Sequence, residues 1–200
     1  MKIVKMNDKG VLPEAVRILK HGGVVMHPTE TCYGLAVDVC NRQALGKLYK
    51  LKGRDVSKPL SILVSDLKMA RKYGVFSDKA LELACKYWPG PLSIAVPRSG
   101  ELPSFFNNGV EFASMRCSSD KFSSKLVNMF GSPITTTSAN VSGKLPLYEV
   151  DDEVLADFGE SVDLVVDGGE FVVKEPSTIV KVDGDKVEVL REGEILFKNL

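Results

Sequence analysis

The part of the sequence that is most informative about the fold is Val24-Val25-Met26-His27-Pro28-Thr29-Glu30-Thr31-Cys32-Tyr33-Gly34-Leu35-Ala36-Val37-Asp38-Val39. Apolar runs at residues 24–27 and 35–39 are typical of buried β-strands. The segment between them is rich in turn formers and in polar side chains. We therefore predict two core strands joined by a polar loop, with His27 packed in the core.

Further strands and helices alternate on both sides of this stretch, which favours an α/β fold. A first helix is expected from Pro13 to Gly22-Gly23, and Asn41, Asp66 and Ser77 are expected to cap three more. Helices are also expected around residues 122–129 and 152–158, and strands at residues 60–64, 92–96, 111–116, 134–137, 162–166, 179–182 and 187–190. We predict one domain over residues 1–200, a twisted mixed β-sheet flanked by helices.

Composition excludes several classes of protein. The chain has 200 residues, 44% of them hydrophobic and 26% charged, which is enough to fill a core and argues against disorder. No apolar run reaches the ~18–20 residues of a membrane span. The four cysteines form no CxxC pair, so reduced thiols and a cytoplasmic location are expected.

The net charge of zero hides a strong asymmetry. Residues 1–100 carry 17 Lys and Arg against 8 Asp and Glu, whereas residues 101–200 carry 9 against 18. Ten acidic residues fall between Glu149 and Glu175, where Lys174 is the only base. The basic excess suggests a polyanionic ligand, and two solvated faces are the alternative.

Four polar clusters stand where predicted elements end, which is where open α/β sheets place their ligands. They are residues 28–34, residues 50–60, residues 135–143, and the two strand-closing arginines Arg116 and Arg191. The hydroxyl-rich third cluster could present N–H and O–H donors to an anion. An ordinary capped loop, turn or surface ion pair is the alternative for each cluster taken alone.

The second cluster places Lys52, Arg54 and Lys58 around Gly53, on what we expect to be an exposed loop after a helix. Arginine binds phosphate bidentately and lysine adds point charges, so this pattern predicts a phosphate site. A solvated basic loop is the alternative, and there is no Walker A motif. GxSxG and metal-ligand spacings are also absent, apart from carboxylates that could help to hold a nucleotide-bound Mg²⁺.

Taken together and in order, the motifs resemble those of YrdC proteins over about residues 10–195. They are Pro28–Leu35, Lys52-Gly53-Arg54 with Lys58-Pro59-Leu60, Trp88–Leu92, Thr137–Gly143, Pro176-Ser177-Thr178 and Leu190–Gly193. The resemblance implies a YrdC-like fold with a concave basic cleft. It also implies threonylcarbamoyl-AMP synthase activity, in which L-threonine, bicarbonate and ATP give threonylcarbamoyl-adenylate and pyrophosphate, with Mg²⁺ accompanying the ATP.

The resemblance also implies roles for particular residues. Threonine would be contacted by Thr31, Arg116, Thr136 and Ser177. ATP would be bound by Arg54, Lys58, Ser138, Asn140, Pro146 and Arg191, with Lys52 beside the phosphates and Lys52 and Arg54 in the catalytic role. The product would feed threonylcarbamoyladenosine modification of tRNA through separate transferase proteins, and tRNA or double-stranded RNA is a further possible partner.

Two features depart from the family pattern. Asp55 stands where proline is common, and the chain ends at Leu200 without the additional C-terminal domain of longer relatives, so the short form is expected. The general base is left open between Glu30 and a water molecule. Two other classes remain as alternatives: a non-catalytic RNA-binding module, and a carbamoyl-phosphate-dependent maturation enzyme.

Overall fold

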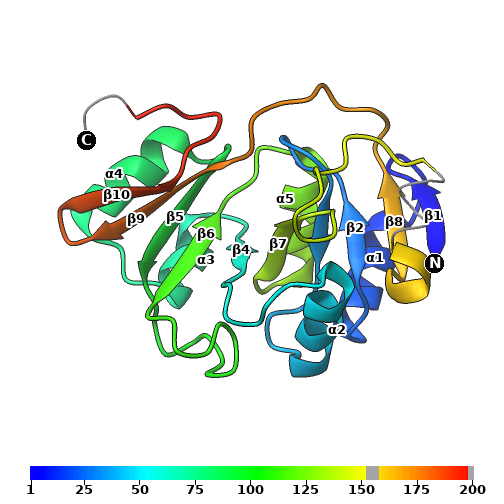
Figure 1. Cartoon of the computed structure of the whole chain (residues 1–200), viewed down its shortest axis with the longest axis horizontal. Coiled ribbons are helices and arrows are strands. Elements are labelled where there is room, and N and C mark those ends of the chain that lie inside the picture. The colour runs from blue at the N-terminus through cyan, green and yellow to red at the C-terminus, as the bar shows by residue number, and fades with distance from the viewer. Residues whose placement is uncertain (152–157, 198–200) are drawn as a thin grey trace.

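A computed structural model describes residues 1–151 and 158–197 of the chain. Its strands are β1 (Lys2–Lys5), β2 (Val25–His27), β3 (Gly34–Ala36), β4 (Ser61–Leu63), β5 (Leu92–Pro97), β6 (Phe112–Arg116), β7 (Ile134–Ser138), β8 (Leu164–Asp167), β9 (Thr178–Asp183) and β10 (Lys186–Arg191). They form one sheet in the order β1-β8-β2-β3-β7-β4-β6-β5-β9-β10 (Figure 1). Parallel and antiparallel pairs alternate irregularly along it, which confirms the predicted mixed sheet.

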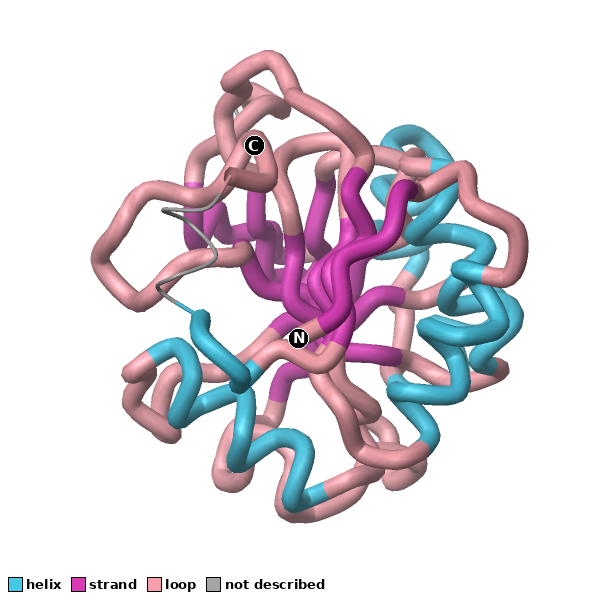
Figure 2. Tube along the Cα trace, turned by 90° about the vertical axis from the view of Figure 1, so that its right-hand side faces the viewer, coloured by secondary structure: helices cyan, strands magenta, loops and turns pink. Residues whose placement is uncertain are grey.

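The described helices lie on both sides of this sheet (Figure 2). They are α1 (Val11–Lys20), α2 (Arg42–Lys52), α3 (Leu67–Tyr73), α4 (Asp78–Tyr87), α5 (Lys121–Phe130) and the short 3₁₀ helix η1 (Gly159–Ser161). The Asn41, Asp66 and Ser77 side chains each accept a hydrogen bond from a first-turn N–H, so the three predicted caps are confirmed.

Alternating strand residues fill two apolar clusters. Val24 and Met26 belong to the larger cluster, whereas Val25 between them belongs to a smaller one with residues of α1 and α5. This follows from the period of two in a β-strand, which sends neighbouring side chains to opposite faces. A strand that is apolar on both faces is therefore covered on both, as an α/β fold requires.

Several expected boundaries differ from the structure. The first helix begins at Val11 rather than Pro13, and β3 ends at Ala36 rather than Val39, although Asp38 still bridges to Ile134. The edge strand β1 was not predicted, because its four residues are mostly exposed and carry little apolar signal. The helix expected at residues 152–158 falls largely outside the described residues.

The segment 168–177 connects β8 to β9 and crosses over the ends of the strands that lie between them (Figure 1). The Tyr33 hydroxyl anchors it, because it accepts a bond from Gly168 N at 2.9 Å and donates one to Gly169 O at 2.8 Å. The Tyr33 ring also meets the Phe171 ring edge-on, with the centroids 5.0 Å apart. A residue of the first polar loop thus fixes a segment more than 130 positions away.

No helix within the described ranges combines the length and the apolar character that crossing a bilayer would require.

His27 is 0% exposed, as predicted for a core histidine. Its Nδ1 lies 2.9 Å from Pro28 O and 3.0 Å from Ser123 Oγ, while Nε2 has no hydrogen-bond partner among the described residues. Burial lowers the pKa of His27 from 6.5 to about 4, so the ring stays neutral near pH 7.

Acidification is expected to destabilise the fold through His27. Between pH 6.5 and pH 4.5 the unfolded chain takes up a proton on this residue and the folded chain does not, so stability falls as the pH falls. The contribution is about 2–3 kcal/mol over that range. Denaturant unfolding of wild type, His27→Gln and the exposed control His21→Gln at both pH values measures this contribution. On acidification, the free energy of unfolding of wild type and of the control should fall by that amount more than the free energy of unfolding of His27→Gln. If the free energy of unfolding depended on pH equally in wild type and in His27→Gln, His27 would not be the source of the acid destabilisation.

Candidate active site

One cavity of about 330 Å³ gathers residues from all four polar clusters. This volume is within the range of small-molecule sites. Nine of the predicted site residues line it: Thr31, Arg54, Arg116, Thr136, Ser138, Asn140, Pro146, Ser177 and Arg191. The sheet brings them together because β7 lies between β3 and β4, which places Ser138 of the third cluster beside Gly34 of the first.

Arg116 closes β6 and is only 5% exposed, so it is no surface ion pair. Its Nη1 lies 3.4 Å from Thr31 Oγ1, and its Nη2 lies 3.4 Å from Thr136 Oγ1. Both contacts are at the long end of hydrogen-bond distances, so the fork of the guanidinium is only loosely occupied. A buried arginine in this state suits an additional anionic ligand, such as a carboxylate.

Arg191 and Ser177 form a second polar unit in the wall. Arg191 Nη2 donates to Ser177 O at 2.6 Å and to Ser177 Oγ at 2.8 Å, and its Nε donates to the same carbonyl at 3.0 Å. This connects the end of β10 to the residue before β9. The Ser177 hydroxyl is therefore fixed by the hairpin that β9 and β10 form.

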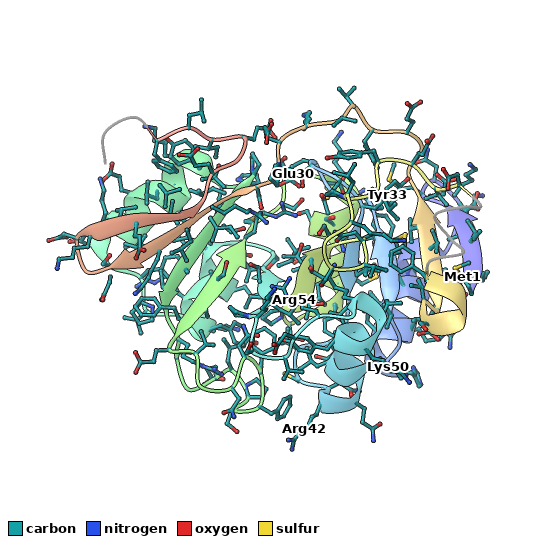
Figure 3. The ribbon with its side chains drawn as sticks, viewed as in Figure 1. Met1, Glu30, Tyr33, Arg42, Lys50 and Arg54 are labelled. Atoms are coloured by element: carbon teal, nitrogen blue, oxygen red, sulfur yellow. The ribbon has the colours of Figure 1, made fainter. Side chains whose placement is uncertain are left out.

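Arg54 reaches the cavity because α2 ends at Lys52, two residues before it. Gly53 adopts φ 54°, a left-handed conformation that glycine accepts without strain, and the chain turns there. Arg54 Nη2 donates to Pro59 O at 2.9 Å, and Figure 3 shows the side chain near the middle of the sheet. Lys58 is not among the lining residues, and neither is Asp55, whose Oδ1 accepts a bond from Ser57 N at 2.9 Å.

Lys52 corrects one expectation, since it does not lie on an exposed loop. It is 2% exposed, and its Nζ donates to Ser138 O at 2.5 Å, to Asn140 O at 2.8 Å and to Asn140 Oδ1 at 2.9 Å. An ammonium has three N–H donors, so all of them are used. Burial lowers the pKa of Lys52 to about 8. In this structure Lys52 holds the loop 138–140 in place and does not line the cavity.

The cavity also contains residues that the sequence analysis did not assign. Lys144, Tyr148 and Lys174 line it, and the Tyr148 hydroxyl donates to Lys174 O at 3.2 Å. One signal could have identified Lys174: it is the only base within the acidic stretch from Glu149 to Glu175. With Arg54, Arg116 and Arg191, five cationic side chains line this cavity.

The cysteine that lines this cavity, Cys32, is not an activated nucleophile. All four are free thiols, as the sequence predicts. Cys32 is a lining residue, and burial raises the pKa of its thiol. A raised pKa keeps the thiol protonated and unreactive near neutral pH.

The fold and this cavity define an α/β protein suited to small anionic ligands, bound where the strands end. The family model Sua5_yciO_yrdC, described as "Telomere recombination", matches residues 17–193. The chain therefore belongs to the Sua5/YciO/YrdC family, which confirms the resemblance drawn from its motifs.

Similar proteins agree with this placement. A Methanocaldococcus jannaschii protein provisionally named threonylcarbamoyl-AMP synthase is 34% identical over 100% of this chain and 95% of its own length. The threonylcarbamoyl-AMP synthase of Vibrio cholerae is 32% identical over 91% of this chain and 97% of its own. Sua5 of Pyrococcus abyssi, solved in complex with L-threonine, superimposes with a TM-score of 0.89 at 27% identity over 96% of this chain. This chain spans only 58% of that longer protein.

Proposed function

We propose that this chain is a threonylcarbamoyl-AMP synthase, an enzyme that converts L-threonine, bicarbonate and ATP into L-threonylcarbamoyladenylate and pyrophosphate. The observation that carries the proposal is the convergence in one cavity of nine residues to which the family resemblance gives a role in substrate binding. The synthases from Vibrio cholerae and Methanocaldococcus jannaschii, which match this chain along nearly their whole length, support it.

The reaction suits a site without a protein nucleophile. The amine of threonine and bicarbonate form a carbamate with loss of water, and a carbamate oxygen attacks the α-phosphorus of ATP. The bond from this phosphorus to the β-phosphate oxygen breaks, and pyrophosphate leaves. Such a step needs reactants held in line and negative charge neutralised, which arginines, lysines and hydroxyls provide.

In this proposal one group of residues binds threonine and a second group binds ATP. Arg116 binds the carboxylate of threonine, with the hydroxyls of Thr31, Thr136 and Ser177 around it. The nucleotide and its phosphates lie along Arg54, Ser138, Asn140, Pro146 and Arg191, to which the structure adds Lys144 and Lys174 as candidates. Lys52 supports this half by holding Ser138 and Asn140. Lys58 remains a candidate phosphate contact outside the cavity.

The proposal extends to the surroundings of the reaction. Mg²⁺ belongs to it as an ion carried by the triphosphate, since Mg²⁺ commonly keeps phosphate and water ligands. No group of three or more His, Cys, Asp or Glu converges in the described part of the chain, so we assign the ion no protein ligand. The proposal also includes that residues 1–200 form one YrdC-like domain and that the protein is cytoplasmic. The product is then transferred to tRNA-modifying proteins.

Substrate selection tests the proposal directly. The purified protein is incubated with ATP, bicarbonate and either threonine, serine or valine, and the adenylate product is quantified. Valine has the shape of threonine without its hydroxyl, so it leaves buried polar groups unpaired and should react poorly. Serine lacks only a methyl group, worth about 1 kcal/mol of burial, and should react better than valine.

Two outcomes would overturn the proposal. Equal rates with valine and threonine would exclude a pocket that recognises the hydroxyl, and a rate independent of bicarbonate would exclude the carbamate route. A protein that binds RNA in a salt-dependent manner without threonine-dependent ATP turnover would instead be the non-catalytic RNA-binding module.

Arg54 and Lys58 offer a matched comparison within one loop, because only Arg54 lines the cavity. Arg54→Ala is expected to lower kcat/KM for ATP roughly ten- to hundredfold, since it removes charge-assisted bonds to phosphate. Lys58→Ala should have a clearly smaller effect. Steady-state kinetics on both variants measures this, and circular dichroism checks the fold. Wild-type kinetics for Arg54→Ala would remove it from the phosphate site.

A further inference from the structure

Arg116 forms a buried ion pair with Glu30, which has no role in the proposed reaction so far. Glu30 Oε1 lies 3.8 Å from Arg116 Nη1, and the two side chains are 12% and 6% exposed. This distance is too long for a hydrogen bond. Within the described residues, Glu30 Oε1 and Arg116 Nε have no hydrogen-bond partner. Glu30 therefore compensates the charge of Arg116 without occupying the fork of its guanidinium.

Ser118 is what holds Glu30 in this position. The Ser118 hydroxyl donates a short hydrogen bond to Glu30 Oε2 and accepts one from Asp120 N at 3.1 Å. Asp120 is the N-cap of α5, so this bond ties Glu30 to the start of a helix. Ser118 itself is 3% exposed. Glu30 is absent from the residues that line the cavity, and Figure 3 places it at the upper edge of the sheet, far from the Arg54 label.

The position of Glu30 decides whether the Arg116 guanidinium is free to bind the carboxylate of a ligand. A guanidinium binds one carboxylate through two parallel N–H bonds. If Glu30 lost its bond to Ser118, its buried carboxylate would have two unsatisfied oxygens, which is costly. Arg116 can satisfy them, because its Nη1 already lies 3.8 Å from Glu30 Oε1 and its Nε has no hydrogen-bond partner among the described residues. An internal carboxylate would then occupy the groups that a ligand carboxylate needs.

We propose that Glu30 and Ser118 are positioning residues that keep Arg116 charge-compensated yet open to a carboxylate ligand: Glu30 supplies the counter-charge, and Ser118 holds Glu30 off the guanidinium fork. This inference rests on the proposed function, in which the ligand is the carboxylate of threonine. It replaces Glu30 as a candidate general base by a role that acts through Arg116.

A double-mutant comparison tests the inference. Ser118→Ala should raise the Kd and the KM for threonine roughly tenfold or more, because Glu30 then competes for Arg116, with little change in the KM for ATP. Glu30→Gln in the same chain removes the competing charge, so the double variant should return to within about threefold of Glu30→Gln alone. The exposed neighbour Ser119→Ala is the matched control and should bind threonine like wild type.

Calorimetric titration with threonine and steady-state kinetics give the readouts. A merely structural role of Ser118 predicts that Glu30→Gln does not rescue Ser118→Ala, and this result would overturn the inference. An unchanged threonine Kd in Ser118→Ala would also overturn it while leaving the proposed function intact. Failure of wild type to bind threonine or to form the adenylate would overturn the proposed function and this inference with it.

Discussion

Arg116→Lys is expected to lower kcat/KM for threonine about a hundredfold, while the Kd for ATP stays close to that of wild type. Lysine keeps the positive charge but has no planar fork, so it cannot bind a carboxylate at two points. It is also too compact to reach both Thr31 Oγ1 and Thr136 Oγ1, which the Arg116 guanidinium approaches at 3.4 Å. Calorimetry with each substrate separates the two affinities.

The selective loss is the decisive feature of this prediction. Glu30 keeps a buried cationic partner in Arg116→Lys, so the variant should fold. Equal losses of threonine and ATP affinity would point to a general defect of the site. Retention of the wild-type affinity for threonine would show that Arg116 does not bind its carboxylate.

Lys52→Met is expected to destabilise the fold by roughly 2–4 kcal/mol and to reduce adenylate formation strongly. Methionine fills much of the space of lysine, but it removes the ammonium donor from Ser138 O, Asn140 O and Asn140 Oδ1. The loop 138–140 then loses its anchor, and two proposed nucleotide contacts lose their geometry.

Lys50→Met is the matched control for Lys52→Met. Lys50 lies two residues earlier in α2 and is exposed, so its replacement should change stability by less than about 0.5 kcal/mol. Denaturant unfolding gives the free energies, and the adenylate assay gives the activity. A Lys52→Met protein as stable and active as Lys50→Met would contradict the anchoring role.

The local sequence determined the elements and their ends. The apolar runs around residues 24–27 and 35–39 predicted the central strands within a few residues, because burial on both faces demands continuous apolar character. Caps at Asn41, Asp66 and Ser77 and the left-handed turn at Gly53 follow from short-range hydrogen bonding and backbone sterics, which the sequence carries directly.

Motif order indicated many of the residues that line the cavity, but it could not assign their contacts. Lys52 and Arg54 are both cationic residue types and stand two residues apart, yet Arg54 lines the cavity and Lys52 is buried against the loop 138–140. The helix end between them decides this, because its geometry points neighbouring side chains in different directions. A charge count along the chain treats the two as equivalent.

Only the tertiary structure decided which distant residues meet. Arg116 lies 85 positions from Thr31 and 20 from Thr136, and it approaches both because β7 stands between β3 and β4 while β6 flanks β4. The same sheet order brings Glu30 and Ser118 together across 88 positions. Propensities and caps are interactions within a few residues, whereas sheet order is set by how all the apolar faces are buried at once, so the pairing around Arg116 exists only in the folded chain.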